Sequence, residues 1–236
     1  MAKSAETMGW AYDLIGRRAF LIGGVGAGLA IPMLAPSAAR AAPGGVPANG
    51  QVAFKVYRKG SHIGEHDLRF EQDGDLLTVT GNVRILVRVG PVPVYRYSHR
   101  CTERWRGDRF VSMDSATQSN VSKHVVSASR AADGVRVTPS GAAPYVLPGN
   151  AAPLTHWNKS IYGNALFNPD DGKILRINLA GRAEDNCRQD DGSSVRATRY
   201  TLTGDSNMDD YYDAADVWAG LHTKVEDGSF VDYRRV

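Results

Sequence analysis

The sequence lacks most of the short motifs by which enzymes are identified. It contains no G-x-S-x-G nucleophile elbow and no glycine-rich phosphate loop. No window of ten or more residues shows a convincing helical period, which argues against a helical or α/β fold. These absences make an enzyme uncertain and favour a protein without catalysis, and they predict no cofactor.

Cysteine is scarce as well, because only Cys101 and Cys187 occur in 236 residues. A scaffold held together by several disulfides is therefore excluded. In an oxidising compartment the two thiols form a candidate disulfide, and the alternative is two unrelated buried thiols.

Long apolar runs are also few, and the one that stands out lies near the N-terminus. It follows the paired Arg17 and Arg18, is rich in glycine and alanine, and ends near "ARA" at Ala39 to Ala41. It is shorter than the ~20 apolar residues of a membrane span. The pattern resembles a twin-arginine (Tat) signal at residues 1–41. We expect export through the Tat translocation machinery to the bacterial periplasm or outside, with no integral membrane segment in the mature chain.

The mature chain has almost no net charge. Removal of residues 1–41 takes four basic and two acidic side chains from totals of 28 and 25, leaving 24 and 23. A balance near zero gives no reason to expect nucleic acid or an anionic membrane as a partner.

Residues 42–50, "APGGVPANG", are predicted to be a flexible linker, and residues 51–236 a single domain. In that domain, turn signals separate runs of alternating apolar and polar residues, which are typical of antiparallel strands. Five Asp-Gly pairs begin at positions 73, 133, 171, 191 and 227. The predicted strands are 51–58, 62–71, 75–89, 92–106, 109–118, 123–130, 134–139, 173–183, 194–203, 216–225 and 229–235.

Alternation also predicts which side chains point inward. Along 92–106 one face carries Tyr95, Tyr97, His99, Cys101, Glu103 and Trp105. With one or two short helices at most, the best candidate being 158–165, such a sheet has to cover itself. The expected fold is therefore all-β, a single antiparallel meander curled into an open or half-closed barrel. Residues 140–156, rich in proline, form a long loop that is a candidate lid.

Four stretches carry a resemblance to a known family. They are "FKVYRKGSHIGEHDLRF", "YRYSHRCTERW", "THWN" and the closing "YYDAADVWAGL…EDGSFVDYR". They resemble an uncharacterised family of exported bacterial proteins known as a domain of unknown function. The resemblance implies an all-β fold similar to the half-barrels of periplasmic lipoprotein carriers, and it implies no reaction.

The stretch "HIGEH", at 62–66, invites a metal interpretation. In an extended strand its two histidines are ~13 Å apart on one face, too far to share one zinc ion. We predict no metal site there, and expect His66 to point inward with Leu68 and Phe70. A second candidate, "DSNMDDYYDAAD" from Asp205 to Asp216, partly matches a calcium loop but lacks its central glycine and final glutamate. The alternative for this segment is a solvated acidic turn between two strands.

Three functions remain open. The favoured one is binding of a small apolar or amphiphilic, lipid-like molecule in the barrel cavity. The alternatives are a cofactor- or metal-dependent periplasmic enzyme and a structural or interaction protein of the cell envelope. The predicted ligand-binding residues are His66, Tyr95, Tyr97, His99, Glu103 and Trp157.

Overall fold

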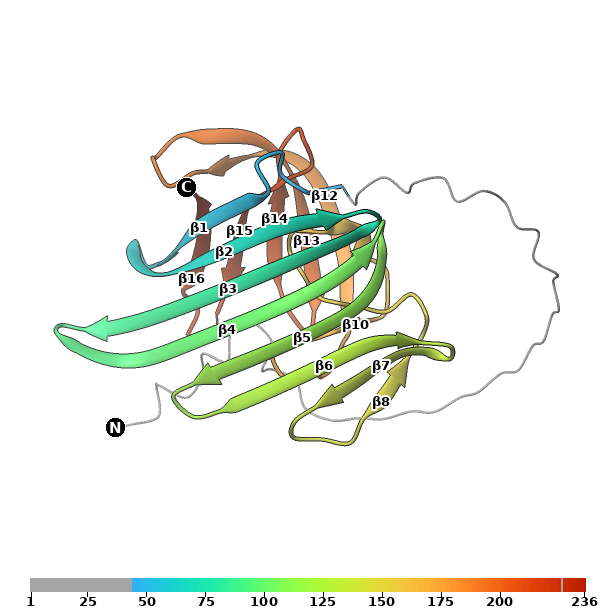
Figure 1. Ribbon diagram of the computed structural model, residues 1–236. Helices are drawn as coiled ribbons and strands as arrows, with labels where there is room; N and C mark the ends of the chain where they lie inside the picture. The colour runs from blue at the N-terminus through green and yellow to red at the C-terminus, as the bar shows by residue number, and fades with distance from the viewer. Residues whose placement is uncertain (1–43, 226) are drawn as a thin grey trace.

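The computed structural model describes residues 44–225 and 227–236, and these residues form an almost purely antiparallel β structure (Figure 1). The predicted signal peptide lies outside the described residues. Consecutive strands are joined mostly by tight turns, and the first seven are β1 (Gln51–Arg58), β2 (Ser61–Asp73), β3 (Leu76–Val89), β4 (Val92–Arg106), β5 (Arg109–Ser119), β6 (Lys123–Ala131) and β7 (Gly134–Pro139). The remaining elements are β8 (Tyr145–Leu147), β9 (Ala152–Pro153), the 3-10 turn η1 (Lys159–Ile161), β10 (Leu166–Phe167), β11 (Ile174–Leu175), β12 (Ile177–Arg188), β13 (Ser194–Gly204), β14 (Met208–Tyr212), β15 (Trp218–Lys224) and β16 (Phe230–Arg235).

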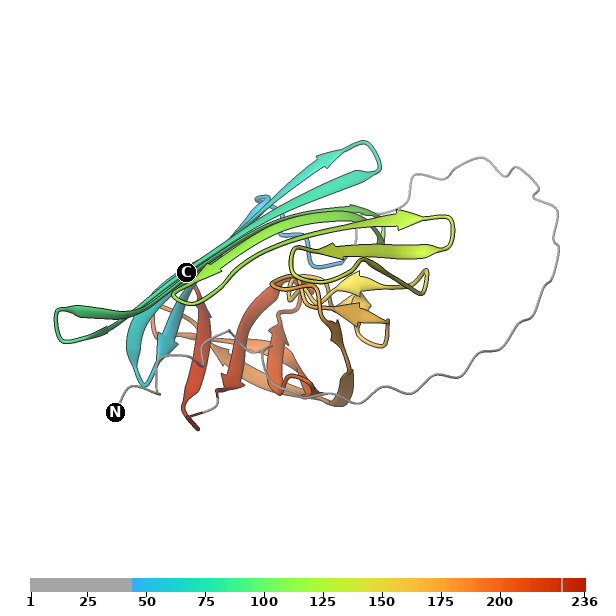
Figure 2. The ribbon, with the colours of Figure 1, turned by 90° about the horizontal axis from the view of Figure 1, so that it is seen from below.

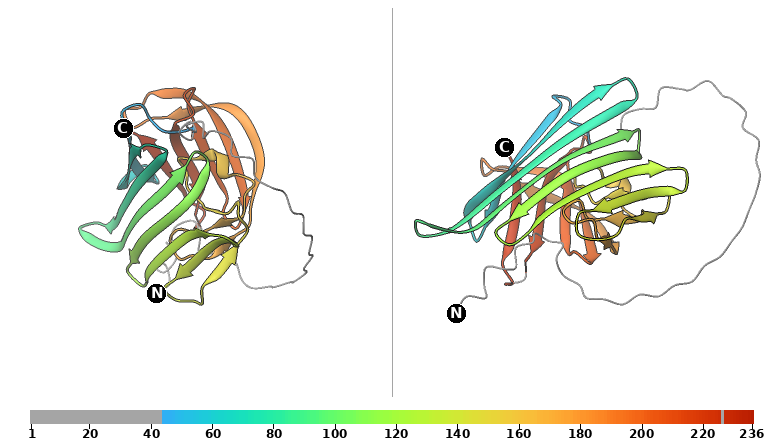
Figure 3. Two further views of the ribbon diagram at one scale, coloured as in Figure 1. Left: turned by 45° about the vertical axis from the view of Figure 1, so that its right-hand side comes forward. Right: turned by 60° about the horizontal axis from the view of Figure 1, so that its bottom comes forward.

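Thirteen strands make one sheet, in the order β12-β13-β14-β15-β16-β1-β2-β3-β4-β5-β6-β7-β8. The last strand pairs with the first, so both ends of the domain meet in the middle of the sheet. The sheet bends there into two walls that face each other (Figures 2 and 3). Strands β1 to β8 form one wall, and β12 to β16 form the other, the C-terminal wall. In the described part of the chain the sheet does not close, since β12 and β8 remain its two edges. The predicted all-β meander in an open barrel is therefore confirmed.

The chain itself fills the space between the walls. Residues 151–175, called the interior segment below, run along the concave side and add a second sheet of β11, β10 and β9. Leu154, Trp157, Ile161, Leu166 and Phe167 of this segment are all fully buried. Only residues 151–156 of the expected lid 140–156 belong to this interior filling, whereas 141–144 and 148–150 are exposed. A bent sheet without covering helices exposes an apolar face that the chain has to bury.

The strand predictions hold for most of the sheet, and all five Asp-Gly pairs occupy turns between strands. The predicted strand 173–183 is split at Arg176 into β11 and β12, while the predicted helix 158–165 is only the single turn η1. Four short strands, β8, β9, β10 and β14, were missed. The expected linker lies against the domain over its described residues 44–50, where Val46 packs on the core.

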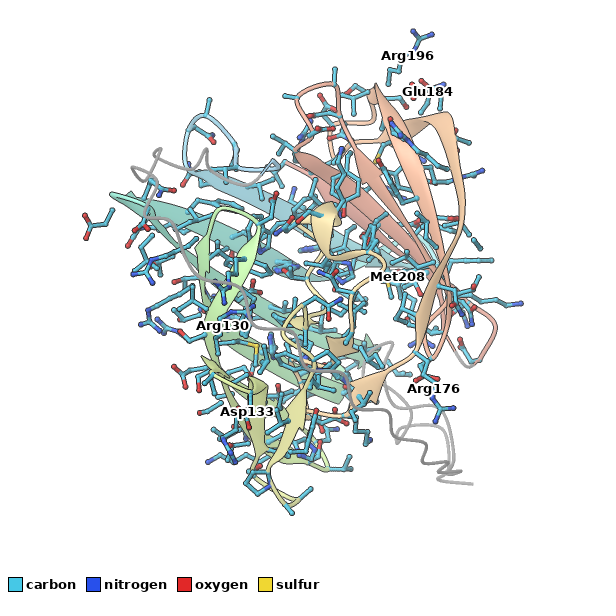
Figure 4. The ribbon with its side chains drawn as sticks, turned by 90° about the vertical axis from the view of Figure 1, so that its right-hand side faces the viewer. Arg130, Asp133, Arg176, Glu184, Arg196 and Met208 are labelled. Atoms are coloured by element: carbon cyan, nitrogen blue, oxygen red, sulfur yellow. The ribbon has the colours of Figure 1, made fainter. Side chains whose placement is uncertain are left out.

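Burial follows the predicted alternation along β3 and β4, where Leu77, Val79, Tyr97 and Trp105 are buried. Aromatic rings continue the core into the interior segment, because Trp157 stands edge-on to both Phe70 and Trp105. The β12–β13 hairpin, marked by Glu184 and Arg196 in Figure 4, folds back so that Cys187 and Ala197 pack on Ala219 of β15. The β6–β7 hairpin on the other wall carries Arg130 and Asp133.

Trp157 joins the interior segment to the wall, and its truncation tests that connection. We expect Trp157→Ala to lower the free energy of unfolding by about 4 kcal/mol, because it opens a large cavity and removes a ring from the core. Urea denaturation followed by circular dichroism measures the change. The exposed Val125→Ala on β6 serves as the control, and an equal effect of both variants would contradict the interior role.

Candidate functional site

A small cavity remains between the two walls, next to the interior segment, and it is partly open to solvent. Its volume is about 90 Å³. One wall supplies His66, Leu68, Val83, Tyr97, His99 and Glu103, the interior segment supplies Leu154, Thr155, His156 and Asp170, and the other wall supplies Met208, Leu221, Thr223 and Tyr233. In Figure 4 Met208 lies on the inner side of the C-terminal wall. The cavity is therefore bordered by apolar side chains together with three histidines and two carboxyl groups.

Of the six predicted ligand-binding residues, four border this cavity: His66, Tyr97, His99 and Glu103. Tyr95 lies near the start of β4, where it is buried in a second apolar cluster. Trp157 is fully buried behind the cavity, where its indole N–H donates to Glu103.

Glu103 is a buried carboxyl group held by tryptophans from two segments. Trp105 Nε1 donates to its Oε2 at 2.9 Å, and Trp157 Nε1 donates to the same oxygen at 3.2 Å. Burial raises the pKa of Glu103, although these hydrogen bonds and one from Thr155 act in the opposite direction. The group thus connects β4 to the interior segment.

His99 is held by a carboxylate that the sequence did not reveal. Its Nδ1 lies 2.9 Å from Oδ1 of Asp170, which belongs to the turn between β10 and β11. The same carboxylate accepts a hydrogen bond of 2.9 Å from the hydroxyl group of Tyr97. A carboxylate on one imidazole nitrogen orients the ring and fixes which nitrogen carries the proton.

A second imidazole–carboxylate pair faces the cavity from the interior segment. His156 Nδ1 lies 2.9 Å from Oδ2 of Asp210, which is fully buried in β14. Asp210 also accepts hydrogen bonds from the Tyr162 hydroxyl group at 2.6 Å and from Trp218 Nε1 at 3.1 Å. This carboxylate therefore has three donors in the protein interior.

The position of Asp210 corrects both interpretations of the acidic segment 205–216. Its middle is strand β14, so it is neither a calcium loop nor a solvated turn. Asp213, another supposed ligand, accepts a hydrogen bond from Arg235 at 2.7 Å. Within residues 44–225 and 227–236, no group of three or more histidine, cysteine, aspartate and glutamate side chains is arranged to hold a metal ion.

His66 is the third histidine, and it differs from the other two. Its Nδ1 is buried and has no hydrogen-bond partner among the described residues. Burial and, to a smaller extent, the neighbouring His156 and His99 rings together lower the pKa of His66 to about 3. The imidazole is therefore neutral at pH 7 and presents an unsatisfied nitrogen.

The structure also shows on which face of β2 each histidine of "HIGEH" lies. His66 points inward as predicted, but a β-bulge in the pairing with β1 makes Ile63 an extra residue and turns it inward. His62 consequently lies exposed on the outer face, with Nε2 2.9 Å from the carbonyl oxygen of Gly64. The prediction that both histidines share one face was wrong, because simple alternation cannot anticipate a bulge.

Both cysteines are free thiols. Cys101 belongs to the main core and Cys187 to the small cluster under the β12–β13 hairpin, so the structure contains the alternative of two unrelated buried thiols. Burial raises the pKa of the Cys101 thiol well above its usual value, and that of Cys187 to about 11. Neither thiol is therefore an activated nucleophile.

Fold and site together define an all-β, barrel-like protein with an open sheet and a small histidine-lined cavity. The chain belongs to the family described as Domain of unknown function (DUF6134), whose model matches residues 54–236. No curated protein matches the sequence. Among the described residues, no helix has the length and apolar character needed to span a membrane.

One solved structure has a similar fold. It is the crystal structure of a β-barrel-like protein of domain of unknown function DUF1849 from Brucella abortus. The two share 12% sequence identity with a TM-score of 0.53, over 84% of this chain and 98% of that chain. At this identity the similarity concerns the fold alone.

The neutral state of His66 makes stability depend on pH. The unfolded chain protonates this histidine below pH 6.5, whereas the folded chain resists protonation down to about pH 3. Stability from this group is therefore complete above pH 6.5 and is lost as the pH falls, by roughly 2 kcal/mol between pH 6.5 and 5. We expect His66→Gln to flatten this part of the profile in urea denaturation. His62→Gln is the matched control on the same strand, and an unchanged profile in His66→Gln would contradict the assignment.

Proposed function

We propose that the protein binds a small molecule in the cavity beside His66. The observation that supports the proposal is His66, whose side chain borders the cavity and whose buried Nδ1 has no partner among the described residues. Buried polar atoms in native proteins are nearly always hydrogen-bonded, to the protein, to ordered water or to a bound group, so an exception beside a cavity supports a ligand site. A ligand with one hydrogen-bonding atom at this position supplies the missing partner.

The cavity limits what this ligand is. Pockets for drug-sized molecules occupy about 300–1,000 Å³, several times the volume found here. Leu68, Val83 and Leu221 provide apolar contacts, while His66 and His99 lie among the polar groups. We therefore propose an amphiphilic molecule of few non-hydrogen atoms rather than a lipid-like one. Since the interior segment fills most of the space between the walls, a ligand with a long acyl chain would have to displace that segment.

We also propose that binding takes place in the periplasm or outside the cell. The support is the twin-arginine pattern at Arg17 and Arg18, which precedes an apolar run and a small-residue cleavage pattern. Proteins exported this way fold before leaving the reducing cytoplasm, and two free thiols agree with folding that needs no disulfide.

The ligand is tested by filling the cavity from Gly81. This residue borders the cavity in β3, and a Cβ added to it would lie 3.8 Å from His66 Nε2 and 3.0 Å from Leu68. We expect native mass spectrometry of protein from producing cells to show a small adduct on the wild type that is missing in Gly81→Val. Gly141→Val is the control, because a Cβ added there has no heavy atom within 4 Å.

A panel of small alcohols, amines and carboxylates provides an independent reading through thermal unfolding. We expect at least one compound to raise the melting temperature of the wild type and of Gly141→Val, but not that of Gly81→Val. Absence of an adduct together with equal responses of all three proteins would refute ligand binding.

A second candidate function is acid–base catalysis, favoured by the 2.9 Å contact between His99 Nδ1 and Asp170. Such a pair orients an imidazole that can take a proton from water. The expected sign is hydrolysis of small activated esters that is lost in His99→Gln and retained in His62→Gln. Equal rates for both variants would exclude a specific role of His99.

A further inference from the structure

The hairpin of β3 and β4 projects beyond the neighbouring strands, and the end of it does not contribute to the cavity. Figures 1 and 2 both show its tip as the farthest point of that wall. The turn consists of Val89, Gly90, Pro91 and Val92. Its two valines are 68% and 57% exposed. Isolated exposed valines are common on protein surfaces, but these two occupy the same projecting tip.

The neighbouring β5–β6 turn adds a third apolar side chain to this end of the molecule. Val121 in that turn is 65% exposed. The turn is attached to the start of β4 by two hydrogen bonds, from Arg96 N to Asn120 Oδ1 at 2.9 Å and from Asn120 Nδ2 to the carbonyl oxygen of Val94 at 3.0 Å. Val89, Val92 and Val121, together with Pro91 and Pro93, are called the apolar tip below.

Positive charge follows the apolar tip along β3 and β4. Residues 76–102 contain four arginines, Arg84, Arg88, Arg96 and Arg100, and no aspartate or glutamate. All four are exposed. Arg84 lies directly opposite Glu65 of β2, whereas Arg88, Arg96 and Arg100 have no ion pair with an acidic side chain of the described residues. The Arg88 guanidinium instead donates to the carbonyl oxygen of Pro91, which holds it beside the turn.

We infer that this end of the molecule is a docking surface for an anionic lipid membrane. A few apolar side chains at a projecting tip can enter the headgroup region, while the arginines behind them contact lipid phosphates. Charge complementarity favours this occupant, since Arg88 and Arg96, which have no acidic partner among the described residues, lie directly behind the apolar tip. A nucleic acid would meet the valines first, and a second copy of this chain would place like charges together.

The experiment measures partition of the full-length protein onto vesicles by flotation. We expect binding to vesicles of phosphatidylglycerol and phosphatidylcholine, little binding to phosphatidylcholine alone, and weakening by salt. Arg88→Gln/Arg96→Gln is expected to reduce partition at least tenfold. The control variant Arg109→Gln/Arg136→Gln removes two charges toward the other end of the wall and is expected to stay within twofold of the wild type.

A fluorophore at the tip tests the same surface without interference from other parts of the chain. An environment-sensitive label on Val92→Cys is expected to shift to shorter wavelengths on anionic vesicles, and the same label on Ser194→Cys is not. The two natural thiols are buried and do not compete for the label. Equal partition of both double variants, or no shift at Val92, overturns the proposal. A tip-dependent dimer in sedimentation without vesicle binding would assign the surface to a second copy instead.

Discussion

The shared hydrogen bonding of Glu103 ties the interior of this protein to its wall. One carboxylate oxygen accepts the indole N–H groups of Trp105 and Trp157, which are 52 residues apart in the sequence. Burying a carboxyl group in an apolar core is costly unless donors surround it. The arrangement therefore holds only when the interior segment lies against β4, and that placement carries His156 and Asp170 to the cavity.

The same principle accounts for the electrostatics of the site. Asp170 and Asp210 each combine an imidazole with a tyrosine hydroxyl group, so that both carboxylates are satisfied inside the protein. These pairs orient His99 and His156 and leave His66 without a comparable partner. Two satisfied histidines and one unsatisfied one around a small volume support the proposed ligand site.

One wall of the sheet carries both the lining of the cavity and the arginines of the proposed docking surface. The inner face of β3 and β4 borders the cavity, and the outer face together with the tip of the same hairpin carries the unpaired arginines. Because side chains alternate along a strand, β4 directs Tyr97 and His99 inward and Arg96 and Arg100 outward. The proposed ligand site and the proposed membrane-facing surface thus share the two strands β3 and β4.

Local sequence determined the sheet. Alternation along 76–106 and the Asp-Gly turns were enough to predict most strands, the inward side chains and an open barrel, because these features depend on neighbours within a hairpin. Asp170, Asp210 and His156 were not identified as site residues, since nothing in "NPDDGK" or "DDYYD" shows that a short strand and an interior turn meet across the barrel. The bulge at Ile63, which separates His62 from His66, depends on the register with β1. The sequence by itself thus determined the strands and their faces. Only the tertiary structure decided which buried donors meet which carboxylates, because those partners come from segments that pack together only when the sheet folds around the interior segment.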